Sequence, residues 1–337
     1  MADTKVLVVD DSLTMRALIT RVLDAQPGIR VVGSANGAEE ARVEVDRLKP
    51  DVMTLDVEMP GMSGIEYLAE LMEKKPMPVV MFSTRTEAGA SSSIEALRLG
   101  AIDCFPKPKV ASQSEFDEIL GKLGTRIRGA KVTAIKPVKA SAPVASFVWN
   151  GRMLVMGTDA SGTQKLFDLL GRFPANCPPT LIVAHLAPEL IDGLIVELDR
   201  HVAPTVTKAD DLTVPEQGKV YITRPGAAHV GVDQWPGGRI RQMPRDPIGG
   251  ERPSISLLFA AQAKAASDQT VALLLTDAGE DGGMGLKAVQ KIGGYVVAPP
   301  AALGEGGTSD YMLMKGNARE PLAWGDVAAR VLKLCAK

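Results

Sequence analysis

The stretch KVLVVDDSLTMRALITRVL, from Lys5 to Leu23, decides how the first half of the chain folds. Four apolar residues follow Lys5, as in a strand that is buried on both faces of a parallel sheet. Ser12 comes after two aspartates and can cap a helix, whose apolar residues recur at helical spacing. The stretch therefore predicts a strand, an acidic loop and a helix, which together open a βα unit.

Alternation of strands and helices continues beyond this stretch. It predicts a doubly wound α/β fold, in which a parallel sheet carries helices on both faces. We expect further strands at 31–34, 52–55, 79–82 and 104–105, and helices at 38–48, 65–74, 91–99 and 115–123.

Polar residues follow several of the predicted strands. In an open α/β sheet, the carboxyl ends of the strands form the edge where ligands bind. Three carboxylates gathered there, Asp10, Asp11 and Asp56, repel one another unless a cation neutralises them, and Mg²⁺ suits such a site. Ser83 and Lys107 supply a hydroxyl and an ammonium for a phosphoryl group. A single aspartate at a strand end is best interpreted as a helix cap. Five polar residues at strand ends, namely the three aspartates, Ser83 and Lys107, instead favour a phosphoryl site.

This pattern resembles the receiver domain of bacterial two-component response regulators, over about residues 3–125. The resemblance implies that a histidine kinase phosphorylates Asp56 in the presence of Mg²⁺. It also implies that Ser83 is a switch hydroxyl, and that the added charge shifts the loops around it between two arrangements. The residues that carry the resemblance are Asp10-Asp11, Asp56, Pro60-Gly61, Ser83 and Lys107-Pro108, and the candidate Mg²⁺ ligands are Asp10, Asp11, Asp56 and Glu58.

One position departs from the receiver pattern. Many receivers carry an aromatic switch residue three positions before the lysine, and this chain has Cys104 there. Phe105 is adjacent, but consecutive residues of a strand point to opposite faces of the sheet. We therefore expect phosphorylation to be retained and the detail of switching to differ.

A basic segment follows the receiver-like half. Residues 126–150 contain five basic side chains and no acidic one, interleaved with Pro, Ala and Ser. Such a composition predicts a flexible or extended linker, either as a plain solvated tether or as a contact for an acidic partner. The predicted division is a receiver domain at 1–125, a basic linker at 126–147 and a second domain at 148–337.

The second half is again of the α/β type, with glycine-rich loops at strand ends. Glycine permits close backbone approach, so such loops often carry function. We expect strands at 153–156, 180–184, 212–214, 219–222, 270–275 and 294–298, and helices at 163–172, 254–266 and 285–292.

This half resembles the output domain of the chemotaxis protein-glutamate methylesterase family, whose members join a receiver to a serine esterase. The resemblance implies a Ser-His-Asp triad that hydrolyses methyl esters of receptor glutamates and, in many members, deamidates receptor glutamines. His185 and Asp281 match the family histidine and aspartate, whereas Asp159 stands where the serine is expected. The motifs that carry the resemblance are the turn at 157–162, Ala184–Pro188, Pro225-Gly226 with His229, Arg252–Ile255 and Thr276–Gly282.

Aspartate at the nucleophile position changes the expected chemistry. A carboxylate has no proton to give to histidine and attacks esters poorly, and removal of a triad serine costs on the order of 10⁶ in kcat. We therefore expect an output domain that has lost esterase activity and acts by binding. The alternative is an active methylesterase and glutamine deamidase that uses Ser161, which otherwise reads as a helix N-cap. His229 either lines the cleft or is a satisfied loop histidine, and His201 is expected at an exposed helix end.

Composition narrows the remaining function classes. The chain has 337 residues, a net charge of −2 and three widely spaced cysteines, which argues against a nucleic-acid partner and against a disulfide framework. No apolar run approaches the roughly 20 residues of a membrane span. We expect a cytoplasmic protein without membrane insertion, whose partners are a chemotaxis-type histidine kinase and chemoreceptors or other proteins of the receptor array.

Overall fold

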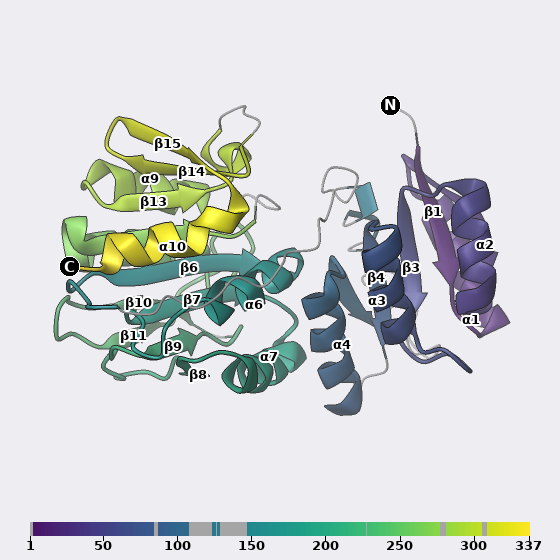
Figure 1. Ribbon diagram of the computed structural model, residues 1–337, viewed down its shortest axis with the longest axis horizontal. Helices are drawn as coiled ribbons and strands as arrows, with labels where there is room; N and C mark the ends of the chain where they lie inside the picture. The colour runs from purple at the N-terminus through teal and green to yellow at the C-terminus, as the bar shows by residue number, and fades with distance from the viewer. Residues whose placement is uncertain are drawn as a thin grey trace. The chain divides into compact units, whose positions relative to one another are not determined.

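The computed structural model describes residues 3–83, 87–107, 123–125, 127–128, 147–226, 228–276, 281–304 and 309–337. Two compact units make up the chain, Met1–Pro137 and Val138–Lys337 (Figure 1). This division falls inside the predicted linker. Residues 129–146 lie outside the described part of the chain, so the boundaries 1–125, 126–147 and 148–337 stay predictions.

A five-stranded parallel sheet forms the centre of the first unit, with the order β2-β1-β3-β4-β5. Each residue of β3 and β4 is buried, as expected of strands covered on both faces. The predicted doubly wound fold is therefore confirmed. Its elements are β1 (Thr4–Val9), α1 (Leu13–Asp24), β2 (Ile29–Ala35), α2 (Ala38–Leu48), β3 (Val52–Asp56), α3 (Gly64–Lys74), β4 (Val79–Ser83), α4 (Glu87–Leu99) and β5 (Asp103–Pro106).

Local signals explain where two of these helices begin. Ser12 caps α1 as predicted, because its side chain accepts a hydrogen bond from the Met15 amide. Ser63 caps α3 in a capping box with Glu66, so that each side chain accepts from the backbone amide of the other. The helix predicted at 115–123 lies outside the described residues, except for Leu123.

The second unit contains an eight-stranded sheet with the order β15-β14-β13-β12-β6-β7-β9-β8. It is parallel from β13 to β8, and β14 and β15 extend it as antiparallel strands. A separate hairpin is made by β10 and β11. The strands are β6 (Met153–Asp159), β7 (Thr180–His185), β8 (Thr205–Lys208), β9 (Lys219–Ile222), β10 (His229–Val232), β11 (Ile240–Met243), β12 (Thr270–Leu274), β13 (Tyr295–Ala298), β14 (Tyr311–Lys315) and β15 (Ala318–Leu322).

Helices cover this larger sheet. One core cluster joins β6, through Met153 and Val155, to α8, through Leu258 and Phe259. Helices α8 and α9 approach closely at Gly285, where an added Cβ would lie 2.5 Å from the Ser256 carbonyl oxygen. The helices are α6 (Thr163–Gly171), α7 (Pro188–His201), α8 (Ile255–Ala266), α9 (Gly283–Lys291) and α10 (Trp324–Cys335), and the short helical turn η2 (Ala160–Gly162) links β6 to α6.

One predicted strand in this unit is wrong. Residues 212–214 form a turn and loop, because Leu212 has a φ of 65°, which turns the chain out of an extended path. The Leu212 amide still donates to the Ile240 carbonyl oxygen at 2.8 Å. Sequence patterns also did not predict β14, β15 and α10. Strands β14 and β15 form one edge of the sheet, and α10 packs against β12 and α6.

None of the helices in the described part of the chain is both long enough and apolar enough to cross a membrane.

Candidate functional site

The first candidate site lies at the carboxyl edge of the receiver-like sheet. Strand β3 ends at Asp56 and β4 at Ser83, while Asp10 and Lys107 directly follow β1 and β5. Parallel pairing of these strands brings the four side chains to one edge. The arrangement is the one that the sequence predicts.

Three carboxylates converge at this edge. Oxygens of Asp10, Asp11 and Asp56 lie within 4.8 Å of one another. Lys107 Nζ donates to Asp56 Oδ2 at 2.6 Å and lies 3.3 Å from Asp10 Oδ2. Glu58 is not part of this group: its side chain is exposed, and its backbone amide donates to Asp56 Oδ1.

Burial of carboxylates at this edge makes their ionised forms less favourable. Desolvation raises the pKa of Asp56 to about 6, and the Asp10 carboxylate also raises it, although the hydrogen bond from Lys107 opposes both. Asp10 Oδ2 is buried, and within the described part of the chain it has the Lys107 ion pair at 3.3 Å but no well-aligned hydrogen bond. Clustered carboxylate oxygens with unmet acceptor capacity suit a hard divalent cation. The residues present therefore fit the Mg²⁺ that the sequence predicts.

The predicted switch hydroxyl has a partner on α4. Ser83 Oγ lies 2.8 Å from Ser93 Oγ, and both side chains are buried. Cys104 Sγ donates to the Ser93 carbonyl oxygen at 3.4 Å, and burial raises the pKa of this thiol. Phe105 instead packs with Phe82 in the receiver core. A hydroxyl and thiol cluster thus occupies the place where the resemblance leads us to expect an aromatic switch.

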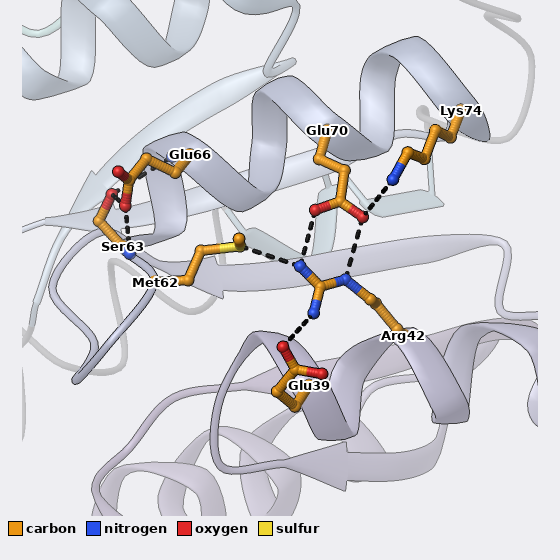
Figure 2. A network of polar contacts seen from close by, with 7 residues as sticks. All are labelled: Glu39, Arg42, Met62, Ser63, Glu66, Glu70 and Lys74. Atoms are coloured by element: carbon orange, nitrogen blue, oxygen red, sulfur yellow. Dashed lines mark hydrogen bonds and ion pairs between the residues drawn. The ribbon is translucent and has the colours of Figure 1, made fainter.

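A surface network joins α2 to α3 and to the loop after Asp56 (Figure 2). Arg42 of α2 makes two hydrogen bonds to Glu70 of α3, at 3.0 and 2.7 Å, and a third to Glu39. Its Nη2 also lies 3.1 Å from Met62 Sδ, in the loop between β3 and α3. Hydrogen bonds from Arg42 and Lys74 lower the pKa of Glu70 to about 2.

The second candidate site lies where β6 ends. Asp159 is the last residue of β6 and is only 4% exposed. Ser161 Oγ donates to Asp159 Oδ1 at 2.6 Å. Helix α6 has Gly162 as its N-cap and no side-chain cap bond, so the interpretation of Ser161 as a helix cap is wrong. Gly162 is required here, since a Cβ would lie 2.2 Å from Thr158 Oγ1.

Strand pairing places His185 opposite Asp159. The two residues are register partners at the ends of β7 and β6. His185 Nε2 lies 3.0 Å from the Pro253 carbonyl oxygen and 3.5 Å from Asp281 Oδ2. Its Nδ1 lies 3.8 Å from Glu251 Oε2. The predicted pair of His185 and Asp281 is therefore brought together.

Asp281 is held by the N-terminus of α8. Its two oxygens accept hydrogen bonds from the Ile255 and Ser256 amides, at 2.6 and 2.9 Å, and from Ser254 Oγ at 2.9 Å. Ser256 Oγ in turn accepts from the Gly282 amide at 2.8 Å. A carboxylate at a helix N-terminus is also favoured by the helix dipole. The acid of the predicted triad is thus anchored mainly by α8.

The two other histidines have distinct positions. His229 is fully buried: its Nδ1 accepts from the Ser254 amide at 3.0 Å, and its Nε2 lies 2.9 Å from the Asp246 carbonyl oxygen. These contacts match the alternative of a histidine with satisfied ring nitrogens, although His229 begins β10 and does not lie in a loop. His201 ends α7 and is exposed, as predicted.

Two groups at this site were not anticipated from the sequence. Glu251 faces His185 from the loop before α8, and Pro253 contributes only its main-chain carbonyl. The motif Arg252–Ile255 had drawn attention to the segment as part of a resemblance. Only the fold shows that the segment touches His185, His229 and Asp281 together.

Each half of the chain matches a known protein family. The family model for the CheB methylesterase matches residues 154–304, and the model for the response regulator receiver domain matches residues 6–116. A protein-glutamate methylesterase/protein-glutamine glutaminase of Caulobacter vibrioides is 41% identical over 297 residues, or 87% of this chain and 86% of that protein. Similarly named proteins of Agrobacterium fabrum and Bordetella pertussis are 38% identical over 299 residues and 32% identical over 340 residues.

These alignments cover 87% of the chain and 85% of the Agrobacterium protein, and 98% of the chain and 97% of the Bordetella protein. Matches of this extent span both units, in the same order. The chain therefore belongs to the CheB family of chemotaxis response regulators, in which a receiver domain precedes a methylesterase domain.

Proposed function

We propose that the chain is a phosphorylation-regulated hydrolase that acts on methylated glutamyl side chains of chemoreceptors and deamidates receptor glutamines. The names of relatives that match both domains support hydrolysis over the binding-only function that Asp159 led us to expect. A single structural observation carries the proposal: Ser161, two residues after the expected nucleophile position, donates its hydroxyl hydrogen to the Asp159 carboxylate.

The receiver is proposed to accept its phosphoryl group at Asp56 from a chemotaxis-type histidine kinase. Lys107 Nζ, 2.6 Å from Asp56 Oδ2, supports this role because it can neutralise charge on the transferred group. Ser83 would donate its hydroxyl to a phosphoryl oxygen once it leaves Ser93. Mg²⁺ held by Asp10, Asp11 and Asp56 would supply a positive charge to offset the carboxylates and the phosphoryl oxygens.

In the output domain, Ser161 would be the nucleophile and Asp159 its general base. As Ser161 Oγ attacks the ester carbonyl carbon, its proton passes to Asp159, 2.6 Å away. Collapse of the tetrahedral intermediate breaks the bond to the methoxy group, which takes the proton and leaves as methanol. Water then attacks the glutamyl–serine ester: its hydroxyl bonds to the carbonyl carbon, its proton passes through Asp159 to Ser161 Oγ as the bond to the serine oxygen breaks, and a glutamate carboxyl group is released.

A second candidate function is binding without hydrolysis. The observation that favours it is the buried position of Asp159, which brings a carboxylate to the place where the family resemblance leads us to expect a nucleophilic hydroxyl. A carboxylate is also a weaker base than imidazole, so proton transfer from Ser161 would be less favourable than in a Ser-His pair. In this case the domain would recognise receptors and leave their esters intact.

Methanol release from methylated receptors separates the two functions. The assay compares the phosphorylated full chain with Ser161→Ala and Asp159→Ser, and with Ser267→Ala as an exposed serine control. If Ser161 is the nucleophile, Ser161→Ala lowers the rate at least about 100-fold and Ser267→Ala leaves it unchanged. Activity that is absent from the wild type and gained in Asp159→Ser would contradict hydrolysis by the natural chain and favour the binding-only function.

A further inference from the structure

One peptide group lies between two histidines of the second domain, the partly buried His185 and the fully buried His229. The carbonyl oxygen of Pro253 is 3.0 Å from His185 Nε2. The amide nitrogen of the same peptide unit, that of Ser254, is 3.0 Å from His229 Nδ1. The rings of His185 and His229 are therefore joined through the two ends of a single planar amide.

The chemistry of this amide fixes the position of each proton. A carbonyl oxygen only accepts, so His185 Nε2 must carry the hydrogen that it shares with Pro253. An amide nitrogen only donates, so His229 Nδ1 must be the bare nitrogen of its ring. The remaining nitrogen of His229, Nε2, then donates to the Asp246 carbonyl oxygen at 2.9 Å. All three hydrogen bonds point the same way, from His185 toward Asp246.

Hydrogen bonds aligned through one amide reinforce one another. When an acceptor binds the N–H end, electron density shifts toward the carbonyl oxygen, which becomes a better acceptor at its other end. His229 is fully buried and both its ring nitrogens are engaged, so its ring is held in one orientation. It can therefore act on His185 without touching it.

We propose that His229 is a positioning residue that keeps the proton of His185 on Nε2 and leaves Nδ1 as the proton-accepting nitrogen. Asp281 supports the same arrangement, since its Oδ2 lies 3.5 Å from Nε2. Nδ1 is the nitrogen on the side of Glu251, whose Oε2 is 3.8 Å away. The hydrolysis proposed above uses Asp159 as the base for Ser161, so this inference concerns the His185 ring alone and does not require that reaction.

Nuclear magnetic resonance of the full chain with ¹⁵N-labelled histidine tests this inference without relying on activity. The chain has three histidines, so three rings contribute to the spectrum. Their signals are assigned from His185→Asn, His201→Asn and His229→Phe. Protonated and bare ring nitrogens differ in chemical shift, so the spectrum gives the tautomer of each ring at a pH where all are neutral.

In the wild type we expect His185 protonated at Nε2 and His229 bare at Nδ1. His229→Phe fills similar space and removes both hydrogen bonds of the His229 ring, so the ratio of the Nε2–H to the Nδ1–H form of His185 should fall by up to about twofold. His229→Gln retains one acceptor and one donor and should restore the ratio, while His201→Asn should not change it. Far-UV circular dichroism verifies that each variant is folded.

A folded His229→Phe variant with an unchanged His185 spectrum would overturn the proposal. So would a wild-type spectrum with the His185 proton on Nδ1, and this outcome holds even if His229→Phe fails to fold. Methanol release plays no part in either measurement. A protein without hydrolase activity can therefore still show the predicted tautomer, and loss of the proposed function is distinguishable from failure of this inference.

Discussion

The two domains use carboxylates in opposite ways. In the receiver, Asp10, Asp11 and Asp56 converge on one another, and the Lys107 ammonium lies 2.6 Å from Asp56 Oδ2 and 3.3 Å from Asp10 Oδ2. In the methylesterase domain, Asp281 accepts three hydrogen bonds from the start of α8, and Asp159 accepts one from Ser161. The difference teaches that nearby donors, more than the presence of aspartates, decide whether a carboxylate site is built for a cation or for holding a loop.

Substitution of Asp56 should have the largest effect. An Asp56→Asn variant replaces the nucleophilic carboxylate by an amide, so incorporation of phosphate from acetyl phosphate with Mg²⁺ should fall at least about 100-fold. The measurement is the amount of labelled phosphate retained by the full chain. Asp46→Asn, at an exposed position of α2, is the control that should label normally, and unchanged labelling of Asp56→Asn would contradict the receiver assignment.

Removal of Asp281 tests the structural use of a carboxylate. Asp281→Ala leaves the Ile255 and Ser256 amides and the Ser254 hydroxyl without their acceptor, which should lower the free energy of unfolding of the methylesterase domain by about 2–4 kcal/mol. All three tryptophans lie in this domain, so urea unfolding followed by tryptophan fluorescence reports on it selectively.

Asp268→Ala provides the matched control for this experiment. Asp268 lies in the exposed turn after α8, and its removal should change the free energy of unfolding by no more than about 0.5 kcal/mol. Equal effects of the two substitutions would show that Asp281 is not the anchor described here.

The pH dependence of Mg²⁺ affinity tests whether the receiver carboxylates form a cation site. Burial raises the pKa of Asp56 to about 6, so this carboxyl group is mostly ionised at pH 7 and mostly protonated at pH 5. Cation binding requires the ionised form, and the apparent affinity for Mg²⁺ should therefore fall about tenfold from pH 7 to pH 5. Isothermal titration at constant ionic strength measures it.

The raised pKa of Asp56 also makes the stability of the folded receiver depend on pH. Because the folded state holds this proton more tightly than the unfolded state, the contribution of Asp56 is fully present below about pH 4 and is lost as the pH rises through about 6. Mg²⁺ should restore stability at neutral pH. An affinity that is equal at pH 5 and pH 7 would mean that Asp56 is not a ligand.

The smallest effect is expected for the exposed network of Figure 2. Arg42→Ala removes the hydrogen bonds to Glu70 and Glu39 and the contact with Met62. Solvent screens such pairs, so the thermal midpoint of the receiver should fall by only a few degrees, and by less at high salt. Arg47→Ala, which loses only Glu44 on the same helix, should have a still smaller effect. A fall as large as that from a core substitution would show that this network holds the loop after Asp56.

Local sequence signals were sufficient for much of the fold. Apolar runs such as residues 79–82 and the cap at Ser12 predicted elements that the structure contains. The error at residues 212–214 arose because a positive φ at Leu212 is invisible in an apolar pattern. The hairpin of β14 and β15 is stabilised by pairing with β13 and by packing, which are tertiary effects that override local propensity.

Some contacts of the two sites could be predicted from the sequence, and others depend on the tertiary structure. Asp10, Asp56 and Lys107 could be placed together because parallel strands share an edge. The partner of Ser161 could not, since it depends on how η2 turns the chain back toward Asp159. Nor could sequence reveal that Ser83 contacts Ser93 and that Cys104 contacts Ser93 in turn, because these contacts join β4 and β5 to α4.

The amide between His185 and His229 has a consequence for mutational drift. Every residue type supplies a main-chain carbonyl, so replacement of the Pro253 side chain leaves the acceptor itself in the chain. The donor at position 254 is lost only if proline is introduced there. Most substitutions at positions 253 and 254 therefore shift the geometry of the link but do not remove it. Single substitutions that do remove the link fall almost entirely on the two histidines at its ends.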